Sequence, residues 1–465
     1  MKNEKKIEKE QLQKTRIKRS KKKPRKRKIL SDFAMILILL IIALMTISFL
    51  VKKGRVIEGG IYEVPEDSVE FLYDLTYEKN GEVVYEHQIF DRIFEIIDNA
   101  ENFIVLDMFL YGTTDKPCYR NLTQELNEHL ITKKRENPQI IIYFLTDNFN
   151  NLKRAENKEH FKELEENGIE IIYLPVNRYS NFLTDIISDA IKISTLKLNH
   201  RKILIADNGD KIVSLVTSGN PHDESSANSN IAVLIKEQIW EDIYKHEKID
   251  AKIKDEKLES FLHEKLSKDN QTLFVQYLVD GGLMKSINRE IGKAEKGDSI
   301  DLATFYLSDP ETIKKLISAS KRGVEIRIIF DTNEFFFGKK KDGTPNKPVA
   351  EKLINKGENI TIRWYKPHGE QFHTKLLIIK NQTNNIIFAG SSNQANNEVI
   401  FYNLQSDLKL ITKNNSKIAG DINNYFNRLW NNENGTYTSD FSEFRSRSTL
   451  KKLKYEFEQF AIKFI

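Results

Sequence analysis

The most informative residues of this chain form a short cluster that occurs twice. Each copy has a histidine, a lysine two residues later and an asparagine twenty residues after the histidine: His200, Lys202 and Asn220, then, 173 residues further on, His373, Lys375 and Asn393. Two imidazoles can divide a phosphoryl transfer between them, because one can attack phosphorus while the other protonates the leaving oxygen. Ammonium and amide groups can hold the charged phosphate oxygens. The doubled cluster therefore predicts one phosphate-handling site with groups from both copies.

An apolar run follows the lysine in each copy and predicts a buried strand. In the first copy the run is residues 203–206, followed by Asp207; in the second it is residues 376–379, followed by Lys380. Because strand side chains alternate, the histidine and lysine of each copy lie on one face of the strand. The small residues before each asparagine predict a turn that returns the amide towards that face.

Other segments repeat in the same order and support a duplicated fold. The comparable pairs are residues 104–109 and 300–305, 140–148 and 326–333, and 168–175 and 360–367. Apolar strands that alternate with helical patterns favour α/β units. We therefore predict an α/β protein with two similar lobes, residues 60–250 and 270–430, whose mixed sheets are related by pseudo-twofold symmetry with the active site between them. Residues 431–465 form a C-terminal extension.

The repeated pattern resembles the phospholipase D superfamily, whose signature is H-x-K-x4-D followed by G-S-x-N, present twice in a bilobed chain. The matching residues are His200, Lys202, Asp207 and Asn220, then His373, Lys375, Ser391 and Asn393. The resemblance implies catalytic roles for the two histidines and two lysines, with Asp207 completing the set, although in the family this aspartate mainly supports the fold. It also implies that Asn220, Ser391 and Asn393 bind phosphate, and it implies no cofactor. His200 is the expected nucleophile, although the two histidines could exchange roles.

Two departures from the family pattern bear on the chemistry. Lys380 stands where the family has aspartate, and we expect its ammonium to lie in water with its stem along the surface. The family often has an N-x-E segment whose carboxylate orients a catalytic histidine. Here the corresponding segments end in amides, Asn230 and Gln405. An amide can fix an imidazole tautomer but stabilises imidazolium less; Asp407 is an alternative orienting group.

The N-terminal residues predict a membrane anchor. Residues 33–51 are nineteen residues without charge, which is long enough for a transmembrane helix. Residues 1–32 hold fifteen Lys or Arg and four Asp or Glu, a net charge of +11. The positive-inside rule places this basic tail in the cytoplasm and the catalytic region outside the cell. A cleaved signal peptide is the alternative, but Lys52 and Lys53 follow directly without a small-residue cleavage site.

Composition limits the remaining possibilities. Because the whole chain is +5 and residues 1–32 are +11, residues 33–465 carry −6. Nucleic acid is therefore an unlikely partner, since its binding relies on basic surface. A single cysteine, Cys118, excludes an internal disulfide, and the nine histidines show no metal-ligand spacing. We predict no required metal.

The predicted function is that of a phospholipase D-like enzyme acting on membrane phospholipids. It would be a phosphodiesterase or a phosphatidyl transferase, with a phospholipid head group or an alcohol acceptor as partner. Two alternatives remain: a nuclease of the same superfamily, and a catalytically weakened phosphate-binding relative, suggested by Lys380 and the two amides. The sequence leaves open the choice of phospholipid, hydrolysis versus transfer, and the oligomeric state.

Overall fold

The computed structural model describes most of the chain after residue 54. The described residues are 35, 55–148, 157–174, 177–178, 196–254, 258, 260, 271–336, 339–395, 403–445 and 456. The predicted transmembrane helix, residues 33–51, and the basic tail lie outside them, apart from Met35. Among the residues the structure does describe, no helix combines the length and apolar character needed to cross a membrane.

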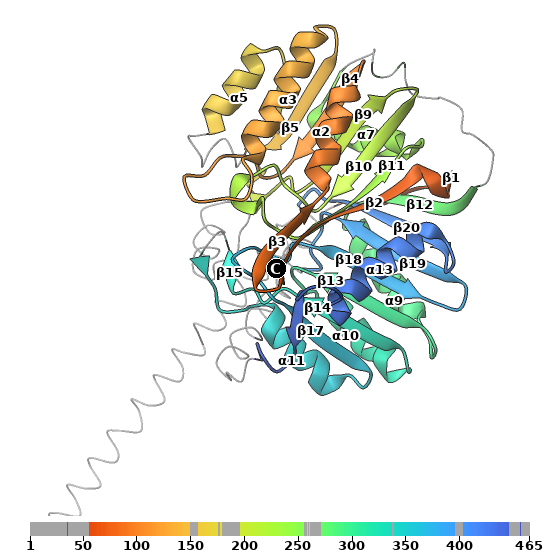
Figure 1. The fold of residues 1–465 in the computed structure, drawn as a ribbon. Helices are drawn as coiled ribbons and strands as arrows, with labels where there is room; N and C mark the ends of the chain where they lie inside the picture. Colours follow the sequence, from red (N-terminus) through yellow and green to blue (C-terminus); the bar gives the residue numbers. More distant parts are fainter. Residues whose placement is uncertain are drawn as a thin grey trace, which may run out of the picture. The chain divides into compact units, whose positions relative to one another are not determined.

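The first lobe is built on an eight-stranded mixed sheet (Figure 1). Its strands, in spatial order, are β3 (Glu82–His87), β2 (Val69–Lys79), β11 (Asn230–Ile235), β10 (Lys211–Thr217), β9 (Lys202–Asn208), β4 (Phe103–Met108), β5 (Ile141–Asp147) and β6 (Glu170–Leu174). β4, β5 and β6 are parallel, and the other neighbours are antiparallel. The helices of this lobe are α2 (Ile89–Asn99), α3 (Leu122–Glu136), α5 (Asn157–Glu166) and α7 (Ile239–Ala251).

The second lobe is built on a nine-stranded mixed sheet. Its strands, in spatial order, are β1 (Val56–Pro65), β12 (Gln271–Asp280), β20 (Ser406–Lys413), β19 (Asn384–Gly390), β18 (Lys375–Lys380), β13 (Ser299–Thr304), β14 (Glu325–Phe330), β17 (Ile360–Tyr365) and β21 (Thr438–Asp440). The helices are α9 (Gly282–Lys293), α10 (Pro310–Lys321), α11 (Asn346–Lys356) and α13 (Lys417–Asn431). Short two-residue strands form the pairs β7–β8 (Asn177–Arg178 and Leu196–Lys197) and β15–β16 (Phe335–Phe336 and Lys339–Lys340).

The two sheets share one strand order over most of their width. The run β2-β11-β10-β9-β4-β5-β6 in the first sheet corresponds to β12-β20-β19-β18-β13-β14-β17 in the second. The predicted α/β class with two lobes and mixed sheets is therefore confirmed. The edges differ: residues 60–65, which we assigned to the first lobe, pair within β1 against β12 of the second sheet. Residues 438–440 of the predicted C-terminal extension also join this sheet, beside β17.

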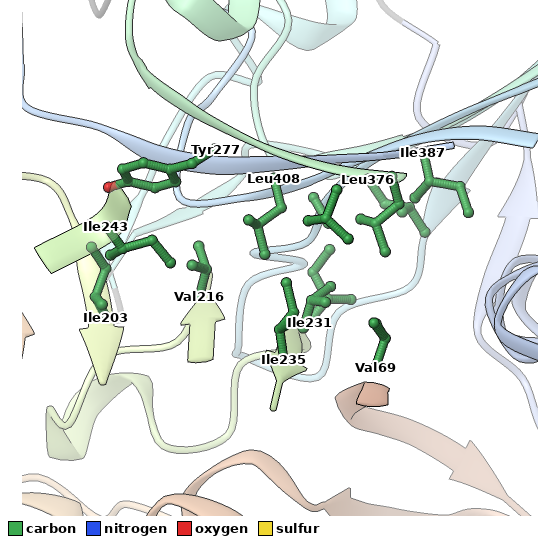
Figure 2. Close-up of a cluster of buried hydrophobic side chains, with 14 of the residues drawn as sticks. Val69, Ile203, Val216, Ile231, Ile235, Ile243, Tyr277, Leu376, Ile387 and Leu408 are labelled. Carbon is green, nitrogen blue, oxygen red and sulfur yellow. The ribbon is translucent and has the colours of Figure 1, made fainter. Parts of the chain in front are cut away.

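The largest hydrophobic core draws residues from both sheets (Figure 2). Ile203, Val216 and Ile231 of the first sheet belong to the same buried cluster as Leu376 and Leu408 of the second. The apolar runs predicted as strands are β9 and β18, which lie inside their sheets and are almost entirely buried. A strand that is covered on both faces has apolar residues at consecutive positions, which explains this sequence pattern. The core fixes the two motif-bearing strands against each other.

Candidate functional site

The two histidines occupy matching places at the start of the two motif strands. His200 precedes β9 and His373 precedes β18, and each is followed two residues later by a buried lysine. Lys202 Nζ donates to the carbonyl oxygen of His200 at 2.6 Å. Lys375 Nζ donates to the carbonyl oxygen of His373 at 2.7 Å. Each ammonium group is thus held beside the backbone of its own histidine.

In each lobe, one buried aspartate binds the backbone N–H of the residue just before the histidine. Asp147, at the end of β5, accepts from the backbone N–H of Asn199 at 2.6 Å. Asp331, directly after β14, accepts from the backbone N–H of Phe372 at 2.8 Å. These strand ends were predicted from the sequence as a repeat, but the two aspartates had no predicted role. An aspartate at the carboxyl end of both equivalent strands was the signal that could have revealed it.

Each histidine is oriented by an amide from the other lobe. His200 Nδ1 donates to Gln405 Oε1 at 3.1 Å. His373 Nδ1 donates to the carbonyl oxygen of Ser218 at 2.9 Å and to Asn230 Oδ1 at 3.2 Å. Because these acceptors are oxygens, Nδ1 carries the proton in both rings and Nε2 is left unprotonated. The amides that replace the family's carboxylate therefore fix the tautomer, and they do so crosswise.

In both lobes a serine hydroxyl donates to the amide oxygen that accepts from the histidine. Ser391 Oγ donates to Gln405 Oε1 at 2.9 Å, and Ser218 Oγ donates to Asn230 Oδ1 at 3.1 Å. Ser391 was predicted to bind phosphate, but its hydroxyl is engaged with the amide, and it also accepts from the backbone N–H of Ser406 at 3.0 Å. In this structure it supports the residue that orients His200.

The surroundings disfavour the charged form of both imidazoles. Burial, followed by the charges of Lys202 and Lys375, lowers the pKa of His200 well below its usual value. Burial, followed by Lys375 and Lys202, does the same to the pKa of His373, and His200 adds to the effect. The lysines of both lobes therefore lower the pKa of each histidine. The structure brings the four predicted residues together in one site.

An aromatic ring packs beside each histidine and its lysine. The ring of Phe109 lies 4.8 Å from that of His200, and Lys202 Nζ lies 5.1 Å from the same ring. Phe305 lies 5.1 Å from His373 and 5.3 Å from the ammonium of Lys375. Both phenylalanines directly follow equivalent strands, β4 and β13. The two strands were predicted as repeats, but the position of these rings beside the histidines was not predicted.

The two asparagines of the motif are buried near the strand ends. Asn220 Oδ1 accepts from the backbone N–H of Leu110 at 3.2 Å, in the loop that follows β4 and Phe109. Asn393 is 4% exposed and lies three residues after β19. Asp407, considered as an alternative orienting acid, accepts from the backbone N–H of Ser392 at 3.1 Å and also from its hydroxyl group.

Asp207 lies away from the histidines, near the far end of β9. Its carboxylate accepts from the backbone N–H groups of Glu101, Asn102 and Phe103 at 2.9–3.0 Å. These bonds hold the chain where it enters β4. Asp207, which we grouped with the catalytic residues, therefore contributes to the fold, as the family resemblance implied.

The prediction that Lys380 extends into water is wrong. Lys380 Nζ forms an ion pair with Asp301 at 2.7 Å, and its side chain is only 24% exposed. Asp301 is buried and also binds Arg327 at 2.7 Å. Asp301 pairs with Ile378 in the second sheet, as Val105 pairs with Ile205 in the first. The second lobe therefore reverses the charge at the motif position and supplies a carboxylate on the neighbouring strand.

Among the described residues, no group of three His, Cys, Asp or Glu side chains is arranged to hold a metal ion.

Comparisons with known proteins agree with this architecture. Residues 287–430 match the family model described as "Cardiolipin synthase, PLD-like domain". Phosphatidylserine synthase from Haemophilus influenzae Rd KW20 has a similar fold, with a TM-score of 0.58 and 13% identity, over 87% of this chain and 95% of that protein. No curated protein gives a significant match to the sequence.

A smaller solved structure is similar to part of the chain. Nuc from Salmonella typhimurium, described as a phospholipase D family member, is 21% identical over 36% of this chain and 97% of its own length, with a TM-score of 0.27. The family model matches the second lobe, and the first lobe repeats its strand order and its His-x-Lys motif. Residues 287–430 therefore match a PLD-like domain, and the whole chain resembles the fold of a phosphatidylserine synthase.

Proposed function

We propose that this protein is a phosphodiesterase or phosphatidyl transferase that acts on membrane phospholipids through a phosphohistidine intermediate. The observation that supports this most strongly is the crosswise orientation of the two histidines by Gln405 and Asn230. Both rings carry their proton on Nδ1, so each Nε2 is available for the reaction. One composite site thus holds a potential nucleophile and a potential acid.

In the first step, His200 Nε2 attacks phosphorus and forms a P–N bond while the P–O bond to the leaving alcohol breaks. His373 donates a proton from Nε2 to the departing oxygen. This requires His373 to be protonated in the complex. An anionic phosphodiester offsets the charges of Lys202 and Lys375, which depress the pKa of His373 in the structure. Substrate binding therefore promotes the protonation that the reaction needs.

In the second step, the neutral His373 takes a proton from water or from an alcohol. The oxygen so activated attacks phosphorus, and the P–N bond to His200 breaks. Water gives a phosphatidic acid, and an alcohol gives a new phosphodiester. Lys202, Lys375, Asn220 and Asn393 are proposed to hold the phosphate oxygens, whose charge the lysine ammonium groups balance.

Two features of the sequence favour a lipid over a nucleic acid as substrate. The apolar residues 33–51 suit a membrane anchor, and residues 33–465 carry a net charge of −6. We propose a single-pass protein of the cell membrane, with the basic tail in the cytoplasm and the catalytic region outside. The family model and the phosphatidylserine synthase fold are consistent with a phospholipid substrate.

The activity can be tested with purified full-length protein in vesicles of mixed phospholipids, with and without glycerol. Mass spectrometry should detect phosphatidic acid or a glycerol-exchanged lipid. His200→Ala and His373→Ala should each lower turnover by at least about a hundredfold. A matched control is His129→Ala, which changes a histidine on α3 outside the site. Unchanged lipids, together with cleavage of a single-stranded oligonucleotide, would instead favour the nuclease alternative.

A further inference from the structure

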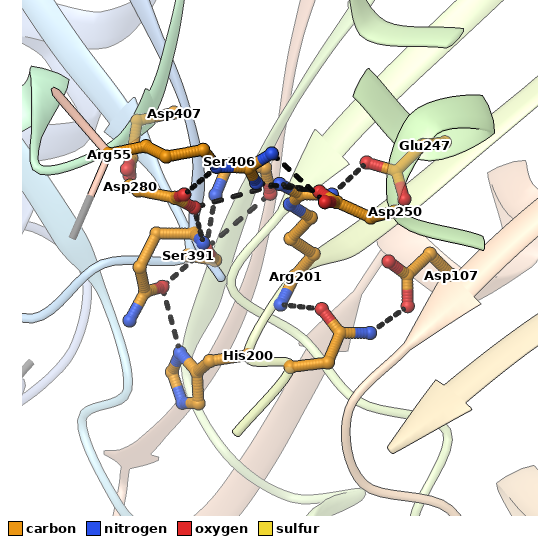
Figure 3. A network of polar contacts seen from close by, with 12 residues as sticks. Arg55, Asp107, His200, Arg201, Glu247, Asp250, Asp280, Ser391, Ser406 and Asp407 are labelled. Atoms are coloured by element: carbon orange, nitrogen blue, oxygen red, sulfur yellow. Dashed lines mark hydrogen bonds and ion pairs between the residues drawn. The ribbon is translucent and has the colours of Figure 1, made fainter. Parts of the chain in front are cut away.

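A largely buried cluster of charged residues lies close to His200 (Figure 3). Arg201, the next residue in the chain, is fully buried and pairs with Glu247 at 3.0 Å and Asp250 at 2.9 Å. Arg55 binds the same Asp250 at 2.7 Å. The proposed reaction assigns no role to these groups. Burying so many charges is costly unless their partners are fixed.

Asp280 connects this cluster to the site. Its Oδ2 accepts from Arg55 Nε at 2.9 Å, and its Oδ1 lies 3.6 Å from Arg201 Nη2. The same Oδ1 accepts from the backbone N–H of Gln405 at 3.0 Å. Asp280 also donates its own backbone N–H to the carbonyl oxygen of Gln405 at 3.3 Å. The residue whose side chain orients His200 is therefore held at its backbone by Asp280.

The backbone of Asp280 is in an uncommon conformation. Its φ of 53° lies in the left-handed region, which only glycine, asparagine and aspartate adopt readily. This conformation ends β12 just before α9, and Gly281 N–H donates to the carbonyl oxygen of Arg55 at 3.0 Å. Such conformations persist where the surrounding contacts determine them, and they occur often at functional sites.

The first lobe supplies a natural comparison. Asp74 pairs with Asn230 across β2 and β11, so it lies beside the orienting amide of His373, as Asp280 lies beside Gln405. The carboxylate of Asp74 instead accepts from the backbone N–H groups of Gln88 and Ile89, at 2.9 and 3.1 Å, where α2 begins. Asp74 thus binds the start of α2, whereas Asp280 binds Gln405, which orients His200.

We infer that Asp280 is a positioning residue that acts on His200 through Gln405, with Arg55 and Arg201 holding its carboxylate. The catalytic consequence rests on the proposed function, but the positioning does not. Among the residues that the structure describes, His200 has this support and His373 does not, because the carboxylate of Asp74 binds Gln88 and Ile89 instead of Asn230. A firmly held imidazole suits attack on phosphorus, for which alignment matters most.

The test uses full-length protein with ¹⁵N-labelled histidine, and the His200 and His373 signals are assigned from single histidine variants. Asp280→Gly removes the carboxylate but fits the positive φ. Asp280→Asn keeps both an acceptor oxygen and tolerance of this conformation. Asp74→Asn is the matched control in the first lobe. Imidazole shifts are followed against pH for each variant, and phosphodiester turnover is measured in parallel.

In Asp280→Gly, we expect His200 to lose its uniform Nδ1–H tautomer and its pKa to move towards the ordinary value, with His373 unchanged. The value of kcat should fall by about tenfold or more while KM changes little. Asp280→Asn should keep the wild-type tautomer and pKa of His200 and the wild-type kcat. Asp74→Asn should leave the His200 signals as in the wild type. Unaltered His200 shifts in Asp280→Gly, or equal changes at both histidines, would refute the inference. The NMR result is independent of whether lipid is the substrate.

Discussion

At the scale of single residues, the site differs from the family pattern in the groups that orient its histidines. A carboxylate would stabilise imidazolium through charge, whereas Gln405 and Asn230 offer only an oxygen dipole. Together with burial and two lysines, this leaves the pKa of both imidazoles well below the usual value. In the proposed reaction, attack would therefore come from a neutral imidazole, and the acid would form only when the substrate binds.

Restoring the carboxylates one at a time should reveal the role of each histidine. Gln405→Glu should raise the pKa of His200, so the acidic limb of the pH dependence of kcat/KM should move to higher pH, since His200 must be neutral to attack. Asn230→Asp should raise the pKa of His373, so the basic limb should move to higher pH, since His373 must be protonated. If each variant moved the other limb, the two roles would be reversed.

A substrate with a good leaving group provides an independent test of the same assignment. p-Nitrophenolate departs without protonation, so a p-nitrophenyl phosphodiester does not need the acid in the first step. We expect His373→Ala to retain a burst of p-nitrophenol, with slow turnover afterwards, and His200→Ala to release none. Stopped-flow absorbance measures both phases. A burst from His200→Ala alone would make His373 the nucleophile.

The spacing of the motif was sufficient to predict that the two histidines and two lysines lie together, but not which residues they contact. His200, Lys202, His373 and Lys375 follow directly from the repeat, and they meet in the structure. The partner of Lys380 did not follow, because Asp301 lies 79 residues earlier in the chain and reaches it only by strand pairing. Likewise, the crosswise contacts depend on how the two lobes pack, which a single motif does not encode.

At the scale of secondary structure elements, the repeat predicted the central strands well. The segments predicted as β4, β5 and β9 and their counterparts β13, β14 and β18 are buried strands inside the sheets. The edge strands β1 and β21 were not predicted to join the second sheet. Their pairing is chosen by which sheet edge is available in space, and period-two patterns carry no information about the partner.

The motif position at the end of β9 and β18 allows a prediction about stability. Asp207→Ala leaves three backbone N–H groups without their acceptor, and should lower the free energy of unfolding by roughly 1–3 kcal/mol. Lys380→Ala removes one partner of Asp301, which keeps Arg327, and should cost about 1 kcal/mol or less. Urea unfolding curves decide this, and Lys211→Ala on the first sheet provides an exposed control. A larger loss for Lys380→Ala than for Asp207→Ala would contradict this order.

At the scale of the whole molecule, the two lobes depend on each other for one site. The proposed membrane orientation can be tested on intact cells, because protease added outside should digest the region after residue 54 and leave a short fragment with the basic tail. Antibodies against tags at the two ends identify the products, and permeabilised cells are the control. Full protection of the catalytic region in intact cells would contradict the orientation.

The shared burial of both histidines also predicts how stability depends on pH. Their pKa is well below the usual value in the folded protein, whereas an unfolded chain titrates near about 6.5. Between these values the unfolded chain binds more protons, so the free energy of unfolding falls as the pH drops below about 6.5. Urea titrations at several pH values measure this dependence. When the pH is lowered below about 6.5, the free energy of unfolding of a His200→Gln, His373→Gln double variant should fall less than that of the wild type. The difference should be up to about 1.4 kcal/mol per histidine per pH unit.

Two buried carboxyl groups change the pH dependence of stability in the opposite direction, so the double variant must be compared with the wild type. Burial raises the pKa of Asp74 and of Asp331 to about 7. These carboxyl groups bind protons in the folded state that the unfolded chain releases, so they favour the folded state as the pH falls towards about 4. Both proteins contain them, so the difference between the two urea titrations isolates the histidines. An identical pH dependence in wild type and double variant would mean that the imidazoles are not held neutral, and the proposed substrate-dependent protonation of His373 would lose its basis.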